Sequence, residues 1–283
     1  MAVLDMTLLT VLAVLIGLVT TCLACLERTQ VRRAWDELGQ RLRGVAPYLG
    51  VAALFFVLKR WTHEQSVQIS RELDWDLTAE IYAIEGEFVA VMQNTIPDET
   101  IAFFSAMYMF GFPFLLVTAP ILYLLASSQR RLKELLIAYV LNYVIGTLFY
   151  TLFVVYGPRN HLSSVSGLMY DFYPQTQDLT AAVSSNTNVF PSLHTSLAIV
   201  VLMLAWRSRR EYPRWLGISG FVVSCVVIST MYLGIHWVVD VVAGVVLGVG
   251  SVYMADWIVD RMERGLGQSS GLEEESVSSE VSD

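Results

Sequence analysis

Charged side chains are scarce in this chain of 283 residues, and lysine occurs only twice. Charged residues make up 16% of the sequence, whereas soluble domains carry about a quarter. Hydrophobic residues make up 55%, and the mean hydropathy is +0.54. These values exclude an ordinary soluble domain and predict a polytopic membrane protein.

Cysteine and excess positive charge are also lacking. The three cysteines, Cys22, Cys25 and Cys225, all lie inside apolar runs, which favours a packing role. The first two form a CxxC, but nothing nearby suggests metal binding or redox chemistry. The net charge of −8 argues against nucleic-acid binding.

Long apolar segments are abundant and define the expected fold. Seven are long enough, or nearly long enough, to cross about 30 Å of hydrocarbon. A further segment, 67–92, mixes apolar and acidic residues and predicts an amphipathic helix lying at the membrane interface. We therefore expect an all-α membrane bundle of about seven spans, at residues 3–25, 45–58, 101–126, 135–156, 193–206, 215–233 and 237–258.

The basic residues predict the orientation of this bundle. Fourteen of the eighteen fall in alternate connections, which places those connections in the cytoplasm, the N-terminus outside and the C-terminus inside. We expect a multi-pass cell-membrane domain over 1–264, with N-terminal spans and the interfacial helix in 1–100 and a catalytic core in 101–264. The acidic tail, 265–283, is expected to be disordered.

His236 and Asp240 are the most unusual residues of the last apolar segment. They are four residues apart and share one face of a helix, so the carboxylate can accept a hydrogen bond from one imidazole nitrogen. That bond strengthens the other nitrogen as a nucleophile or base. The alternative is a polar clamp between membrane helices.

Two further polar segments are expected to lie on the outer face of the membrane together with the segment that carries His236. His194 follows Ser192 at a predicted helix start, where free N–H groups attract an anion such as phosphate and the serine caps the helix or binds that anion. Arg159 in "YGPRN" suits a lipid headgroup contact or a bidentate phosphate ligand. The alternative for the segment with His194 is a plain helix start with an exposed histidine at the interface.

Together these residues favour phosphoryl transfer over metal binding. They supply a nucleophile, an acid and donors for phosphate oxygens. His194, His236 and Asp240 could also hold zinc. However, an HExxH motif is absent, and a serine, an arginine and a helix start favour an anion over a cation.

The motifs "PSLH" at 191–194 and "STMYLGIHWVVD" at 229–240 resemble those of the phosphatidic acid phosphatase type 2 superfamily. The resemblance covers roughly 135–258 and implies a six-helix phosphatase-type core with one extra helix. Leu193 stands in place of the usual glycine, Thr230 in place of an arginine, and Leu152 in place of a lysine. These differences resemble the branch of inositol phosphorylceramide and sphingomyelin synthases.

The resemblance also implies a role for each site residue. His236 would be the nucleophile that forms a phosphohistidine, Asp240 would orient it, and His194 would protonate the leaving oxygen. Ser192 and Arg159 would hold phosphate oxygens. The substrate would be a membrane lipid phosphate or phospholipid and the acceptor water or an alcohol, with no metal or nucleotide cofactor. A lipid phosphatase and a headgroup phosphotransferase are both compatible, and the alternative is a non-catalytic lipid or small-solute carrier.

Overall fold

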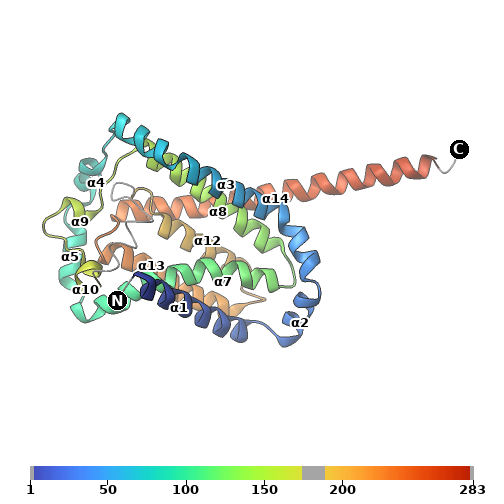
Figure 1. The fold of residues 1–283 in the computed structure, drawn as a ribbon, viewed down its shortest axis with the longest axis horizontal. Helices are drawn as coiled ribbons and strands as arrows, with labels where there is room; N and C mark the ends of the chain where they lie inside the picture. Colours follow the sequence, from blue (N-terminus) through green and yellow to red (C-terminus); the bar gives the residue numbers. More distant parts are fainter. Residues whose placement is uncertain (1–2, 174–188, 281–283) are drawn as a thin grey trace.

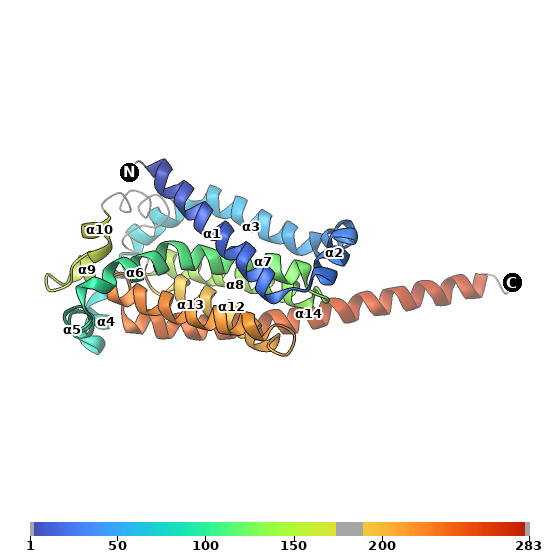
Figure 2. The ribbon, with the colours of Figure 1, turned by 90° about the horizontal axis from the view of Figure 1, so that it is seen from below.

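The computed structural model describes residues 3–173 and 189–280. These residues form helices, turns and loops without a strand, apart from an isolated bridge between Asp76 and Val154. A helix satisfies all of its interior backbone groups by itself, as a chain in hydrocarbon requires. The predicted all-α membrane bundle is confirmed, and its long helices run side by side (Figures 1 and 2).

Five helical segments of the described residues are long and apolar enough to cross a membrane. The helix α12 (Leu193–Arg207) is apolar but shorter, because 15 residues rise only about 22 Å. The predicted span 45–58 lies within α3 (Leu38–Leu73), which is not among the five. The five are α1 (Val3–Cys25), η1 to α7 (Asp98–Leu125), α8 (Arg130–Leu152), α13 (Pro213–Tyr232) and the first part of α14 (Val238–Glu280).

The segment 67–92 is not the single interfacial helix that its composition predicts. The helix α3 ends at Asp74, whose φ of 46° is left-handed, and α4 (Thr78–Glu85) ends at Gly86, whose φ is 61°. Such values stop a right-handed helix. The chain then continues as α5 (Phe88–Thr95). Short helices therefore gather at one end of the bundle, where α9 (Pro158–His161) and α10 (Leu168–Phe172) also lie (Figure 1).

The central helix α12 packs very closely against α14. A side chain at Gly244 would place its Cβ 2.5 Å from the carbonyl oxygen of Ser192, and one at Gly248 would lie 2.6 Å from that of Ser196. The two glycines are four residues apart on one helix face, as in the small-residue contacts of membrane helices. Their lack of side chains lets the start of α12 lie directly against α14.

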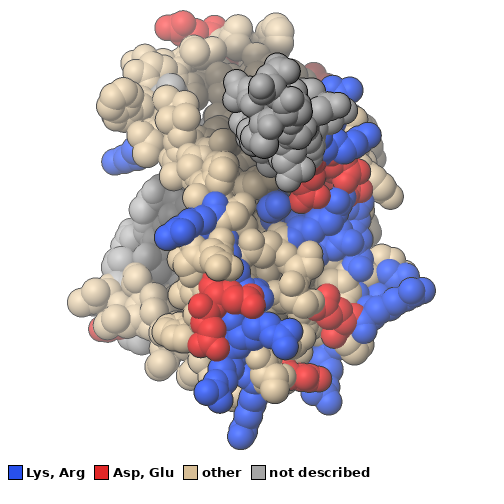
Figure 3. Space-filling model, turned by 90° about the vertical axis from the view of Figure 1, so that its right-hand side faces the viewer, with Lys and Arg blue, Asp and Glu red and all other residues tan. Residues whose placement is uncertain are grey.

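The opposite end of the bundle carries an ion-pair network. Glu134 is completely buried and accepts hydrogen bonds from Arg130, Arg131 and Arg207. Arg130 also pairs with Asp256 on α14. Figure 3 shows acidic and basic side chains gathered over this end. The network holds α8, α12 and α14 together far from the short helices.

The helix α14 continues to Glu280, beyond the bundle (Figure 2). The expected disorder of the acidic tail, 265–283, stays a prediction.

We predict that Gly244→Ala lowers the stability of the bundle. Its Cβ would meet the backbone of Ser192, which cannot move aside as a flexible side chain can, so the expected loss is about 1–3 kcal/mol. Thermal unfolding followed by circular dichroism would measure it. Gly250→Ala on the same helix is the control, because nothing lies within 4 Å of its Cβ position. Equal midpoints for the two variants would contradict the close packing of α12 on α14.

Candidate active site

Three chain segments that are distant in sequence meet at the end of the bundle that carries the short helices. The backbone N–H of Arg159 donates to the carbonyl of Gly234 (3.0 Å), which joins the loop after α8 to the turn between α13 and α14. The N–H of Ser192 donates to the carbonyl of Asp240 (3.0 Å), which joins the start of α12 to α14. The structure thus brings together all three predicted segments.

The turn before His236 is built around a glycine. Gly234 has a φ of 69°, and a side chain there would also lie 2.8 Å from that of Val165. The carbonyl of Thr230 then accepts the N–H groups of both Ile235 and His236, each at 3.0 Å. Glycine is required by both the backbone angle and the crowding, and the double acceptor fixes the position of the histidine.

His236 and Asp240 form the predicted pair. The histidine Nδ1 lies 3.4 Å from the aspartate Oδ2, which also accepts the N–H of Trp237 at 2.8 Å. Both side chains are buried, at 3% and 0% exposure. The aspartate thereby orients the imidazole through its Nδ1.

His194 lies in the first turn of α12 and faces the other histidine. The ring centres of His194 and His236 are 5.9 Å apart, and Tyr108 and Phe112 lie 4.8 and 4.5 Å from the first ring. Ser192 caps the helix, since its hydroxyl accepts the N–H of Thr195 at 3.3 Å. The two imidazoles therefore lie close together, beside aromatic rings, at the N-terminus of α12.

Arg159 carries a positive charge close to His236. Its Nη2 donates to the hydroxyl of Tyr170 at 2.8 Å, and its guanidinium carbon lies 4.4 Å from the centre of that ring. Its Nη1 is buried and has no hydrogen-bond partner among the described residues. Burial, reinforced by the cation of Arg159, lowers the pKa of His236 to about 3. The imidazole is therefore neutral near pH 7.

Thr230 and Leu152 stand where the superfamily pattern has an arginine and a lysine, and neither brings a positive charge to the site. Thr230 is completely buried, and its hydroxyl donates to the carbonyl of Val227 in its own helix at 2.8 Å. Leu152 is the last residue of α8 and has an apolar side chain. The positive charge that the structure places next to the histidines comes from Arg159.

Sequence reasoning did not find Glu85. This last residue of α4 accepts the N–H of Val239 at 3.1 Å, and so caps the N-terminus of α14 one residue before Asp240. Burial raises the pKa of the Glu85 carboxyl. In the sequence this residue is one of several acids in an amphipathic segment, and 155 positions separate it from Asp240. No local spacing could reveal the contact.

A second residue that the sequence did not reveal is Tyr150. Its hydroxyl donates to the carbonyl of Pro191 at 2.9 Å, which supports the segment leading into α12. In the part of the chain that the structure describes, no three histidine, cysteine or acidic side chains are grouped to hold a metal ion. The absence of a metal cofactor stays a prediction from the sequence.

Comparison with known protein families matches residues 83–254 to the PAP2 superfamily. The match covers more than half of the chain and includes every candidate site residue. The chain belongs to the PAP2 superfamily. This confirms the superfamily that the sequence motifs indicated, while the synthase-like branch stays a prediction.

Two similar proteins were also found. An uncharacterized protein of Methanocaldococcus jannaschii is 31% identical over 167 residues, which are 57% of this chain. The match spans 63% of that relative, less than two thirds of its length. The crystal structure of Aquifex aeolicus LpxE aligns with a TM-score of 0.49 at 19% identity, over 61% of this chain and 94% of that one.

We predict that Glu85→Gln makes the stability of the protein less dependent on pH. Because the folded state raises the pKa of this carboxyl above its ordinary value of 4.5, its contribution is full at low pH and is lost as the pH rises through the raised pKa. The wild-type thermal midpoint should therefore fall more than that of the variant between about pH 4 and 7.

The matched control is Glu80→Gln, an exposed position on the same helix. It should keep the wild-type pH profile. If the wild type and both variants have parallel profiles, Glu85 does not titrate as its burial requires.

Proposed function

We propose that this chain is a membrane-embedded phosphoric ester hydrolase or phosphotransferase whose substrate is a lipid phosphate or phospholipid. The observation that carries the proposal is the facing pair of histidines, His194 and His236, beside a guanidinium nitrogen of Arg159 that has no partner among the described residues. Membership of the PAP2 superfamily supports the same chemistry.

In the first step, Nε2 of His236 attacks the phosphorus of the bound ester. A bond forms between nitrogen and phosphorus, and the bond from phosphorus to the leaving oxygen breaks. His194 gives its proton to that oxygen, so the product leaves as a neutral alcohol. A negative phosphate beside His194 favours the protonated form that this step needs. Asp240 stabilises the positive charge that develops on His236.

The phosphate oxygens need donors on the other side of the space. Arg159 can offer its Nη1, and the start of α12 offers backbone N–H groups and the positive end of the helix dipole. The hydroxyl of Ser192 accepts from Thr195 and can still donate its own hydrogen to an oxygen. These donors would stabilise the charge on the equatorial oxygens during transfer.

In the second step, an oxygen nucleophile attacks the phosphohistidine and releases His236. His194, now neutral, takes the proton of the attacking group. Water gives a phosphatase, and a polyol or lipid hydroxyl gives a phosphotransferase. The absence of basic side chains at Thr230 and Leu152 is the feature shared with the branch of inositol phosphorylceramide and sphingomyelin synthases.

We place the site at the outer membrane face. The arginines of the ion-pair network lie at the opposite end of the bundle, and positive residues favour the cytoplasmic side. The N-terminus is then outside, and α14 leads into the cytoplasm. Cysteine labelling of intact cells at an exposed residue of α9 such as Asn160 would test this orientation.

We predict that His236→Ala abolishes turnover, with a loss of at least about a thousandfold. Purified protein in detergent would be given phospholipids with and without an alcohol acceptor, and free phosphate and transfer product would be measured separately. His161→Ala is the control, because this histidine is exposed and lies against the rings of Tyr82 and Trp237 rather than in the site. Retained activity in His236→Ala would remove the proposed nucleophile.

The intermediate itself can be trapped. Brief reaction with a phospholipid carrying radioactive phosphate should label the wild type with an acid-labile, base-stable group, and His236→Ala should take up none. A carrier would bind the lipid without turnover and without label. Binding with neither label nor product would therefore favour the carrier over the enzyme.

We predict that Arg159→Gln weakens substrate binding, with KM raised about tenfold, since a charge-assisted hydrogen bond to phosphate contributes about 1.5–3 kcal/mol. Arg159→Lys keeps the charge but loses the planar fork and the stacking on Tyr170, and should recover only part of the loss. Initial rates at several substrate concentrations would separate KM from kcat. An unchanged kcat/KM in Arg159→Gln would show that this arginine does not bind the phosphate.

A further inference from the structure

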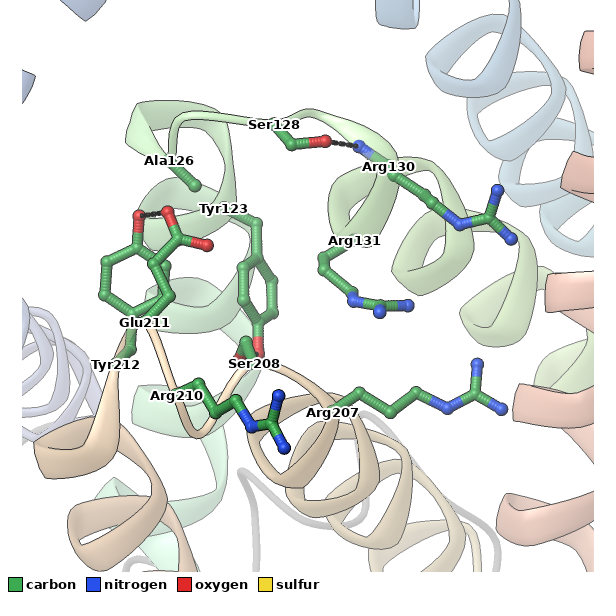
Figure 4. A pocket seen from close by; sticks show the side chains of 10 residues that line it. All are labelled: Tyr123, Ala126, Ser128, Arg130, Arg131, Arg207, Ser208, Arg210, Glu211 and Tyr212. Carbon is green, nitrogen blue, oxygen red and sulfur yellow. Dashed lines mark hydrogen bonds between the residues drawn. The ribbon is translucent and has the colours of Figure 1, made fainter.

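A pocket of about 260 Å³ opens at the end of the bundle opposite the candidate active site. It lies between the loop joining α7 to α8 and the loop joining α12 to α13 (Figure 4). Four arginines line it, namely Arg130, Arg131, Arg207 and Arg210. The proposed reaction does not use any of them.

The framework of the pocket is fixed by buried hydrogen bonds. The hydroxyls of Tyr123 and Ser208 are 3.1 Å apart, and both side chains are buried. Glu211 also lines the pocket, but its carboxylate accepts hydrogen bonds from the hydroxyls of Ser127 and Tyr212. The two loops are therefore tied together, and the one acidic lining residue is already engaged.

Two of the four arginines are neutralised by α14. Arg130 lies 2.7 Å from Asp256 and 2.6 Å from Asp260, and Arg207 lies 3.4 Å from Asp256. Figure 4 shows both guanidinium groups extending away from the Tyr123 side of the pocket. They form part of its wall rather than its binding groups.

The other two arginines, Arg131 and Arg210, have guanidinium N–H groups without an acceptor among the described residues. Arg131 uses its Nη1 to bond Glu134, at 2.8 and 2.6 Å, and its other guanidinium nitrogens have no acceptor among the described residues. Arg210 forms no hydrogen bond or ion pair with any described side chain or backbone group. Figure 4 shows these two guanidinium groups on the same side of Tyr123, turned toward a common space.

We propose that this pocket is a second anion site, which binds a phosphate group between Arg131 and Arg210. Guanidinium forks match two phosphate oxygens each. The first turn of α8, a helix of 23 residues, starts at the pocket and adds the positive end of its dipole. A bound anion would also relieve the repulsion between the two cations, so it should stabilise the loops it bridges.

The phosphate could belong to a lipid headgroup of the adjacent leaflet or to a soluble phosphate compound. Full-length protein would be placed in nanodiscs of phosphatidylcholine and titrated with inorganic pyrophosphate. In a second arm, the nanodiscs would contain increasing phosphatidylglycerol. The thermal midpoint is followed in both arms for the wild type, Arg210→Gln and Arg209→Gln.

In at least one arm, Arg210→Gln should lower the apparent affinity for the ligand about tenfold, as measured from the ligand-dependent rise of the thermal midpoint. Arg209→Gln is the matched control. It makes the same charge change one residue away, but Arg209 bonds the carbonyl of Trp206 and stacks on that ring outside the pocket. It should behave as the wild type does.

The arm that responds identifies the source of the phosphate. A loss with pyrophosphate alone indicates a soluble ligand, and a loss with phosphatidylglycerol alone indicates a lipid headgroup. Equal stabilisation of all three proteins in both arms would place any binding elsewhere, including at Arg159, and would overturn the proposal. Equal weakening in both variants would show only general attraction to a basic surface, and would overturn it too.

Discussion

The hydrogen bond from the backbone N–H of Ser192 to the carbonyl of Asp240 is the contact on which the candidate site depends. It joins the start of α12, which carries His194, to the first turn of α14, which follows His236. The bond can form only because Gly244 has no side chain where the two helices meet. This backbone contact and the absence of a Cβ at Gly244 therefore help to hold the two helix ends that carry the imidazoles close together.

How much of this was predictable depends on whether a contact is local in sequence. The pairing of His236 with Asp240 follows from helical spacing, and the cap at Ser192 follows from the residue types that begin helices. Glu85 and Tyr108 were not found, because each is more than 80 positions away in sequence from the residue that it contacts in the site, Val239 and His194 respectively. The length of an apolar segment predicts a membrane span, but it does not indicate that α3 ends at Asp74, a residue with a left-handed backbone conformation.

The two ends of the bundle differ in how their buried charged groups are paired. At the network end, Glu134 is buried among three arginines, so the cost of removing a carboxylate from water is offset by paired donors. At the site end, Arg159 faces aromatic rings and a neutral histidine. The same helices, α8, α12 and α14, connect both ends, and the network fixes their relative positions without entering the reaction space.

The buried atoms of the site that have no hydrogen-bond partner among the described residues include Nη1 of Arg159 and Oδ1 of Asp240. An unsatisfied buried polar atom costs about 1–3 kcal/mol, so a ligand that satisfies such an atom gains binding energy. A phosphate oxygen satisfies the guanidinium but would repel the carboxylate. In the proposed reaction, the carboxylate gains only when His236 becomes positive during phosphoryl transfer. The arginine would then favour the bound substrate and the aspartate the transition state, so the cost of burying Asp240 would contribute to catalysis.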